Sequence, residues 1–217
     1  MPDRKTRIKV CGIRTRGSVN AVSDGVDYVG FNFWSKSRRF IAPSDAGRLA
    51  GGLPRHIRVV GLFVNPRRSE VDRVLDELAV DILQFHGDES PTFCQSFGIP
   101  YMKAIRLRDH SSVDAIADFL PSPDGYILVD TYVAGMVGGT GSPVRLDLAA
   151  AARAQYPDAR LFLAGGLDTA RVGQAISEIQ PYAVDVASSV ERTAGDKSTA
   201  KVRAFVRAVE SADSQCK

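Results

Sequence analysis

Cysteine is scarce in this chain, whose 217 residues include only Cys11, Cys94 and Cys216. An odd and widely spaced set argues against a framework of disulfide bonds and against a thiolate metal site. The histidines are equally few and do not form a cluster with the spacing of metal ligands. The sequence therefore predicts chemistry that uses no metal ion and no other cofactor.

Long apolar runs are missing too. No run approaches the roughly 20 residues of a membrane-spanning helix, and the first residues lack the apolar region of a signal peptide. We therefore expect a cytoplasmic protein that does not bind membranes. The net charge is small, at +3, which suits an anionic small molecule and gives no argument for a nucleic-acid partner.

Low-complexity stretches and linker segments are also absent from the sequence. We therefore expect one domain that covers residues 1–217, a length sufficient to bury a substantial core. The polar end of the chain, Ser211–Lys217, is predicted to be a disordered tail.

Eight short apolar stretches of strand type recur along the chain. Between several of them lie segments with the apolar periodicity or capping residues of helices, for example after Pro43, Ser69, Asp168 and Ser198. Apolar strands that alternate with helices indicate a parallel sheet covered on its faces. The predicted strands are Ile8–Ile13, Tyr28–Trp34, Arg58–Val64, Ile82–His86, Tyr101–Leu107, Tyr126–Asp130, Leu161–Ala164 and Ala183–Val186.

This alternation predicts an α/β fold, namely a single (β/α)8 or TIM barrel. The alternative is an open, doubly wound sheet, which usually has fewer strands. The G-x-G-x-x-G pattern that such a sheet often carries after its first strand is missing here. We therefore expect the barrel, and with it an active site at the C-terminal ends of the strands.

Residues capable of acid–base chemistry stand at several of these strand ends. Cys11 ends the first strand, and its thiol can act as a base once ionised, although a buried structural cysteine is the alternative. Asp130 ends the sixth strand, where it could also cap a helix. His86 ends the fourth strand and, taken alone, fits a structural histidine. Their convergence on one rim predicts an acid–base site.

Glycine and serine residues follow the last two strands. Gly165 and Gly166 bring bare backbone close to a predicted helix start, where N–H groups and the helix dipole favour an anion. Ser188 and Ser189 close the eighth strand, and phosphate sites in such barrels commonly form from the loops after strands seven and eight. The Gly-rich segment 138–141 is weaker evidence, because it also fits a flexible loop. We expect a phosphorylated small molecule as the ligand.

A series of short motifs supports this view. They are Lys9–Ile13, Val29–Phe31, Lys36–Phe40, Gly61–Asn65, Gln84–Glu89, Val129–Thr131, Gly138–Gly141, Leu163–Leu167 and Val184–Val186. With these motifs in this order, the chain resembles the phosphoribosylanthranilate isomerases of tryptophan biosynthesis from about Ile8 to Glu210.

The resemblance implies an Amadori rearrangement, in which N-(5-phosphoribosyl)anthranilate becomes 1-(2-carboxyphenylamino)-1-deoxyribulose 5-phosphate. It implies that Cys11 is the general base, that Asp130 is the general acid, and that Arg39 contacts the anthranilate carboxylate. Ring opening needs a proton on the furanose oxygen, and the resulting iminium makes the sugar C2 proton acidic enough for a thiolate. The full set of expected substrate-binding residues is Arg39, His86, Asp185, Gly139, Gly141, Gly165, Gly166, Ser188 and Ser189.

Two positions depart from the pattern of this family. Ser189 stands where the family usually has glycine, and Leu148 stands where it usually has tryptophan. If the backbone at Ser189 required positive φ, the serine would be strained. We expect no such strain, and we expect the hydroxyl to supply a hydrogen bond that glycine cannot.

Lys9 leads to a further expectation. Side chains alternate along a strand, so Lys9 should share the inward face of Cys11. Barrel closure brings the eighth strand beside the first, which predicts a buried ion pair between Lys9 and Asp185. The charge of Lys9 is expected to favour the thiolate of Cys11.

Two other functions stay open. One is a catalytically silent phosphosugar-binding barrel with a regulatory or scaffolding role, against which the presence of both Cys11 and Asp130 argues. The other is a different enzyme of the same fold. The missing metal cluster argues against a metal-dependent epimerase, and Cys11 argues against a histidine-pathway isomerase, whose base is an aspartate. For partners, we expect a phosphorylated small-molecule substrate and a monomer, with a homodimer as the alternative.

Overall fold

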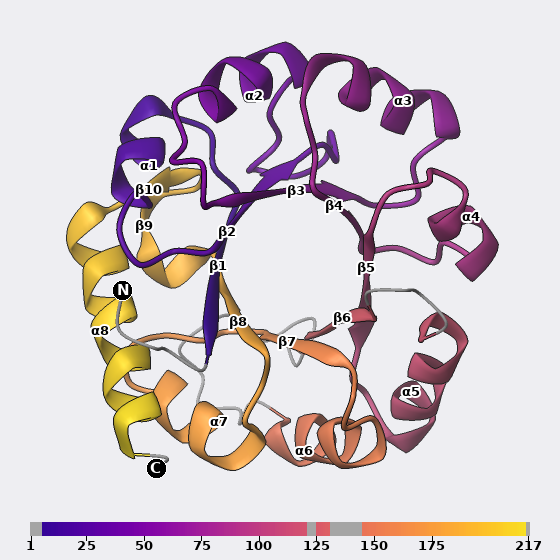
Figure 1. Cartoon of the computed structure of the whole chain (residues 1–217), viewed down its shortest axis with the longest axis vertical. Helices are drawn as coiled ribbons and strands as arrows, with labels where there is room; N and C mark the ends of the chain where they lie inside the picture. The colour runs from indigo at the N-terminus through magenta and orange to yellow at the C-terminus, as the bar shows by residue number, and fades with distance from the viewer. Residues whose placement is uncertain (1–5, 121–124, 131–144, 216–217) are drawn as a thin grey trace.

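The computed structural model describes residues 6–120, 125–130 and 145–215. Eight parallel strands close into a barrel in the order β1 to β8, and helices surround it on the outside (Figure 1). Strand β1 pairs with β2 on one side and with β8 on the other, which closes the ring. The predicted (β/α)8 barrel is confirmed.

The elements alternate as the sequence pattern indicates. The barrel strands are β1 (Arg7–Cys11), β2 (Tyr28–Asn32), β3 (Arg58–Phe63), β4 (Ile82–Phe85), β5 (Tyr101–Arg106), β6 (Tyr126–Asp130), β7 (Arg160–Ala164) and β8 (Ala183–Val186). The α-helices are α1 (Arg16–Ala21), α2 (Pro43–Ala50), α3 (Arg68–Glu77), α4 (Pro91–Gln95), α5 (His110–Asp114), α6 (Leu146–Gln155), α7 (Val172–Ile179) and α8 (Thr199–Gln215). Two 3-10 turns, η1 (Ala115–Phe119) and η2 (Ser188–Val190), and a small antiparallel hairpin of β9 (Glu191–Thr193) and β10 (Asp196–Lys197) complete the described elements.

Side chains on each strand alternate between two regions. On β1, Ile8 and Val10 belong to the large apolar cluster that lies between the strands and the surrounding helices. Lys9 and Cys11 occupy the opposite face, and both are buried. This alternation places polar groups inside the barrel while the apolar face holds the helices.

An aromatic plug fills the barrel at the N-terminal ends of its strands. Tyr28 and Phe162 pack edge to face with their ring centroids 5.2 Å apart. Tyr126 packs against Phe162 as well, and its hydroxyl accepts a hydrogen bond of 2.8 Å from Arg58. Because bulky side chains occupy this end, the polar residues at the C-terminal strand ends are left to line the opposite mouth.

Helix α6 is not indicated by the sequence pattern. It contains five alanines in ten residues, so apolar side chains occur on every face and no 3.6-residue period stands out. Alanine nevertheless has the highest helix propensity, and Leu148, Ala149 and Ala152 are buried against the barrel wall. Helix propensity and burial, rather than amphipathicity, explain this element.

The end of the chain differs from expectation. Helix α8 continues to Gln215, so the prediction of a disordered tail from Ser211 is wrong for residues 211–215. Ala212 and Asp213 are buried, and the Asp213 carboxylate accepts hydrogen bonds from the backbone N–H and hydroxyl of Thr6, at 2.9 and 2.7 Å. This contact fixes the last helix beside the start of β1.

Within the described ranges, no helix combines the length and apolar character needed to cross a bilayer.

Candidate active site

A cavity of about 350 Å³ opens at the C-terminal ends of the strands. All eight barrel strands or the loops that follow them contribute to its lining. Of the residues predicted from the sequence, the lining includes Cys11, Arg39, His86, Asp130, Gly165, Gly166, Asp185 and Ser188. Ser189 is not part of the lining, and Gly139 and Gly141 lie outside the described residues.

Lys9 and Asp185 form the predicted ion pair. The Lys9 Nζ donates to Asp185 Oδ1 at 2.9 Å, and the two residues are register partners on β1 and β8. The Lys9 side chain is completely buried, whereas the Asp185 side chain is 12% exposed to the cavity side. Burial alone would lower the pKa of Lys9, but Asp185 and Cys11 outweigh this effect and raise it. Lys9 is therefore a permanent positive charge beneath the cavity.

The pKa of the Cys11 thiol is determined mainly by the burial of the side chain. Burial raises the pKa of Cys11, Lys9 opposes the rise, and the nearby Asp185 carboxylate adds to it. The net pKa lies above the ordinary value. Lys9 thus favours the thiolate, as expected, but it does not overcome burial. The thiol stays protonated at neutral pH, and its basic form becomes available as the pH rises.

Two glycines make room around this cysteine. Gly30 lies opposite Cys11 on β2, and a Cβ at Gly30 would lie 2.8 Å from the Cys11 Sγ. Gly12 has φ +82, and a Cβ there would lie 2.5 Å from the Arg39 Cδ. The glycine after Cys11 is therefore required both for its backbone conformation and for the passage of the Arg39 side chain.

Asp130 and His86 meet across the cavity from β6 and from the end of β4. The His86 Nε2 lies 3.4 Å from Asp130 Oδ2, and each side chain is about one-fifth exposed, at 20% and 19%. A carboxyl group in this position can exchange a proton with a ligand in the cavity while His86 limits its rotation. The alternative role of Asp130 as a helix cap is not needed, since its carboxylate faces the cavity.

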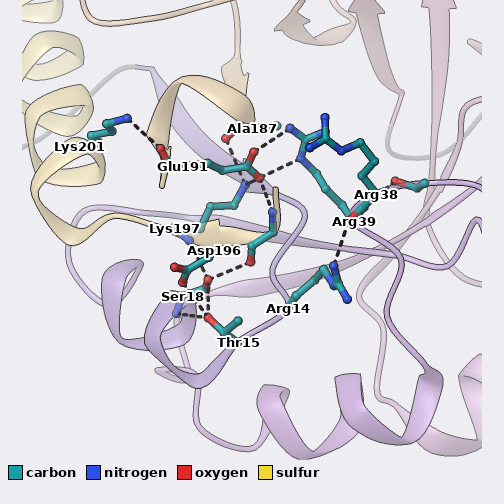
Figure 2. A network of polar contacts seen from close by, with 12 residues as sticks. Arg14, Thr15, Ser18, Arg38, Arg39, Ala187, Glu191, Asp196, Lys197 and Lys201 are labelled. Atoms are coloured by element: carbon teal, nitrogen blue, oxygen red, sulfur yellow. Dashed lines mark hydrogen bonds and ion pairs between the residues drawn. The ribbon is translucent and has the colours of Figure 1, made fainter. Parts of the chain in front are cut away.

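Arg39 is held by a buried carboxylate that the sequence pattern does not reveal. Its Nε and Nη2 donate to the two oxygens of Glu191, at 2.8 and 2.7 Å. Glu191 in turn accepts from the Lys197 Nζ at 2.7 Å and from the Gly195 backbone N–H at 2.9 Å (Figure 2). Lys197 also donates to the Ala187 carbonyl, next to Ser188. The β9–β10 hairpin therefore connects Arg39 with the turn after β8.

The charges in this network stabilise one another. Burial acts to raise the pKa of Glu191, but Arg39 and Lys197 outweigh it and lower that pKa. The hydrogen bonds to Glu191 raise the pKa of Arg39. Burial lowers the pKa of Lys197 although Glu191 opposes the shift. Glu191 is thus an ionised carboxylate that compensates two cations.

We expect Glu191→Gln to destabilise the protein by about 3 kcal/mol, because it leaves the buried Lys197 without a counter-charge. The same substitution releases Arg39 and should raise KM for a substrate with a carboxylate. Urea unfolding and steady-state kinetics measure the two effects. Asp196→Asn is the matched control, because it breaks the exposed pair with Arg192 on the same hairpin and should change stability far less. Equal losses in both variants would contradict the role of Glu191.

The loops after β7 and β8 form the predicted anion-binding side. Gly165 and Gly166 both have positive φ, which glycine adopts without strain. Asp168 caps the turn that leads into helix α7: its carboxylate accepts the backbone N–H groups of Ala170 and Arg171, and its carbonyl accepts the Val172 N–H at 3.0 Å. This capped turn lies directly after Gly165 and Gly166, which line the cavity.

Ser189 occupies the position where the sequence departs from the family pattern. Its φ is not positive, so the serine is unstrained, as expected. Its hydroxyl donates to the Leu167 carbonyl at 2.7 Å. This hydrogen bond joins the loop after β7 to the turn after β8, a connection that a glycine could not make.

We expect Ser189→Gly to raise KM for the phosphorylated substrate by about three- to tenfold, because one hydrogen bond of about 1 kcal/mol and the restricted backbone of serine are both lost. The measurement is KM together with inhibition by inorganic phosphate and by anthranilate. Inhibition by phosphate should weaken while inhibition by anthranilate stays constant. A lower KM would show that serine hinders the site.

Several lining residues escape prediction from the sequence. Trp34 lies at the mouth, is 38% exposed, and is the sole tryptophan of the chain. Asn32, Leu62, Gln84 and Arg106 also line the cavity. Leu62 and Gln84 lie on strands whose inward faces the alternation could have identified, but nothing in the sequence shows which inward residues reach the cavity.

Among residues 6–120, 125–130 and 145–215, no group of three or more His, Cys, Asp or Glu side chains is placed to hold a metal ion.

Known proteins of one family are similar to this chain over nearly its whole length. Residues 8–208 match the family model described as N-(5'phosphoribosyl)anthranilate (PRA) isomerase. The N-(5'-phosphoribosyl)anthranilate isomerase of Citrifermentans bemidjiense is 43% identical over 202 residues, which cover 93% of this chain and 95% of that protein. The corresponding enzyme of Pseudomonas fluorescens is 42% identical over 204 residues, or 94% of this chain and 98% of that protein.

Solved structures agree with these relatives. The crystal structure of phosphoribosyl anthranilate isomerase from Thermotoga maritima has a TM-score of 0.86 and 30% identity, and the match covers 95% of this chain and 99% of that one. A second such isomerase was crystallised in complex with reduced 1-(o-carboxyphenylamino)-1-deoxyribulose 5-phosphate. Its TM-score is 0.81 at 28% identity, with 95% and 99% of the two chains covered.

Proposed function

Because the chain belongs to the N-(5'-phosphoribosyl)anthranilate isomerase family, we propose that it converts N-(5'-phosphoribosyl)anthranilate into 1-(2-carboxyphenylamino)-1-deoxyribulose 5-phosphate in tryptophan biosynthesis. The reaction is an Amadori rearrangement with Cys11 as the general base and Asp130 as the general acid. The observation that supports these roles most directly is that both side chains line one cavity, on β1 and β6.

Asp130 acts first. Its carboxyl proton goes to the furanose oxygen as the bond between that oxygen and C1 breaks, and the nitrogen lone pair forms the iminium. His86, 3.4 Å away, restricts the carboxyl group to the orientation that faces the substrate. General acid catalysis of this kind typically contributes about 10²–10⁴-fold to a rate.

Cys11 acts second. Its thiolate takes the proton from C2, and the electron pair of that C–H bond forms the C1=C2 double bond as the iminium nitrogen becomes neutral. The resulting enolamine tautomerises to the ketone. Since the pKa of Cys11 is raised, kcat/KM should increase from neutral into alkaline pH as the thiolate fraction grows.

The two anionic ends of the substrate bind on different sides of the cavity. Arg39 binds the anthranilate carboxylate, and the exposed ring of Trp34 lies where it can cover the aromatic ring. The phosphate binds to the backbone around Gly165, Gly166 and Ser188. Arg39 is linked through Glu191 and Lys197 of the β9–β10 hairpin to the Ala187 carbonyl, next to Ser188, so the two ends of the site are held at a fixed separation.

Turnover by the purified protein tests this function. Loss of anthranilate-type fluorescence on addition of N-(5'-phosphoribosyl)anthranilate follows the reaction directly. A catalytically silent phosphosugar-binding barrel would bind the substrate without this loss. An enzyme with a different sugar phosphate as its substrate would give neither turnover nor tight binding.

We also propose that the protein works in the cytoplasm as a monomer, with the homodimer as the alternative. Among the described residues, Trp34 is the only large hydrophobic side chain that is exposed. The bound substrate would cover it. Trp34 by itself therefore gives no argument for a second copy of the chain.

A further inference from the structure

Gln84 is a buried polar residue with an unsatisfied atom. It lies on β4 with its side chain inside the barrel, is 0% exposed, and lines the active-site cavity. Its Oε1 has no hydrogen-bond partner among the described residues. Among these residues, no other buried side-chain nitrogen or oxygen atom lacks a partner. Buried acceptors without a partner are costly and rare, so this one needs an explanation.

The other end of the amide is engaged. The Gln84 Nε2 lies 3.3 Å from His86 Nδ1. With the amide in this orientation its N–H donates to Nδ1, and the imidazole proton is then on Nε2, which lies 3.4 Å from the Asp130 carboxylate. Gln84 is the first member of a chain of polar groups that ends at the proposed general acid, and the opposite atom of the amide points away from His86.

Packing does not require a polar side chain at this position. The register partners of Gln84 on β3 and β5 are Leu62 and Met102, which are both apolar. A methionine or leucine would fill the same volume without an unsatisfied oxygen. The amide is therefore retained at a cost in stability, and such costs are typical of functional sites.

We propose that Gln84 is a substrate-binding residue whose Oε1 accepts a hydrogen bond from a hydroxyl group of the sugar chain; this rests on the proposed function. An amide oxygen repels anions, so neither the carboxylate nor the phosphate of the substrate is its partner. Those groups bind at Arg39 and at the loops after β7 and β8. The part of the substrate between them is a chain of carbons that bear hydroxyl groups.

A hydroxyl group also fits Gln84 in either orientation of its amide. If the amide were turned over, Oε1 would face His86 and Nε2 would be the unsatisfied atom. A hydroxyl can accept as well as donate, so it would pair with whichever atom faces the cavity. The substrate therefore satisfies Gln84 when it binds, and a competing molecule without hydroxyl groups does not.

The test is Gln84→Met, which keeps the volume and removes both polar atoms. Calorimetry measures binding of the reduced product analogue, 1-(o-carboxyphenylamino)-1-deoxyribitol 5-phosphate, and a thermal scan measures Tm. We expect Kd for the analogue to rise about tenfold, with a similar fall in kcat/KM, because one well-placed hydrogen bond is lost. Tm should rise by about 2–4 °C, because an unsatisfied buried acceptor is removed.

Analogues that each lack one hydroxyl group identify the partner. For the wild-type protein, removal of the hydroxyl that contacts Gln84 should weaken binding about tenfold. For Gln84→Met, removal of that same hydroxyl should cost nothing further, as in a double-mutant cycle. Met102→Leu is the packing control, because Met102 is buried beside Gln84 but does not line the cavity. It should leave Kd unchanged.

Two results would overturn the proposal. One is a Gln84→Met protein that binds the reduced analogue with wild-type affinity, which would mean that Oε1 is satisfied by water in the presence and absence of substrate. The other is a cycle in which every hydroxyl loss is additive with Gln84→Met. If Gln84→Met does not fold, Gln84→Leu takes its place in the same cycle. A wild-type protein without turnover would instead contradict the proposed function, so the two failures are distinguishable.

Discussion

Cys11→Ala and Asp130→Asn are each expected to lower kcat by about 10²–10⁴-fold, the range that general acid–base groups contribute. Neither change should unfold the protein. Cys11→Ala removes a single sulfur atom at the edge of a cavity, and Asp130→Asn preserves the shape of a partly exposed side chain. Stopped-flow or steady-state fluorescence measures kcat, and circular dichroism checks the fold.

Cys94→Ala is the matched control for the first variant. Cys94 lies on α4, is completely buried, and does not line the cavity. The same chemical change there should leave kcat near the wild-type value. Retention of more than about a tenth of wild-type kcat in Cys11→Ala or Asp130→Asn would fall outside the range for such groups, and the corresponding role would have to be given up.

Lys9→Met is expected to have the second large effect, a loss of about 10²-fold in kcat/KM at neutral pH, because the pKa of Cys11 rises further without its nearest cation. The alkaline increase in kcat/KM and the alkylation of the thiol should both move to higher pH. Iodoacetamide titration in a Cys94→Ala, Cys216→Ala background reports Cys11 alone. The raised pKa of Lys9 keeps its ammonium charged through neutral and mildly alkaline pH, so the wild-type protein retains this influence there.

Lys103→Met separates the electrostatic effect from a loss of stability. Lys103 lies on β5, is 4% exposed in its side chain, and pairs with Glu89 at 2.7 Å. Breaking either buried pair should cost about 3 kcal/mol. Only Lys9→Met should change the titration of Cys11. An identical thiol titration in wild type and Lys9→Met would exclude Lys9 from the catalytic chemistry.

The fold could be predicted because its strands are short apolar stretches that alternate with amphipathic helices. Helix α6 could not be predicted in this way, because alanine on every face leaves no apolar periodicity. The end of α8 was misjudged for a related reason. Ser211, Ser214 and Gln215 suggest a solvated tail, but Asp213 among them is buried by its hydrogen bonds to Thr6. A partner 207 positions away in the sequence is invisible to a local pattern.

The candidate site also has parts that could be predicted from the sequence and parts that could not. Residues at strand ends could be predicted because barrel geometry alone brings them to one rim, and the pairing of Lys9 with Asp185 followed from alternation and closure. The ion pair between Arg39 and Glu191 could not be predicted, because Glu191 lies 152 positions later on a hairpin outside the barrel. The net pKa of Cys11 was also inaccessible, because burial opposes Lys9 and only the structure shows that burial is the larger effect.

The seam between β1 and β8 has a consequence for how the molecule is made. The Lys9–Asp185 contact joins residues 176 positions apart, and Thr6 and Asp213 are still further apart in the chain. During synthesis, one edge of β1 has no neighbour until β8 and α8 have left the ribosome. Open strand edges invite association with other chains, and contacts of such long range form slowly. The nascent protein is therefore most vulnerable to aggregation just before its last helix emerges, and dependence on chaperones should be concentrated in that interval.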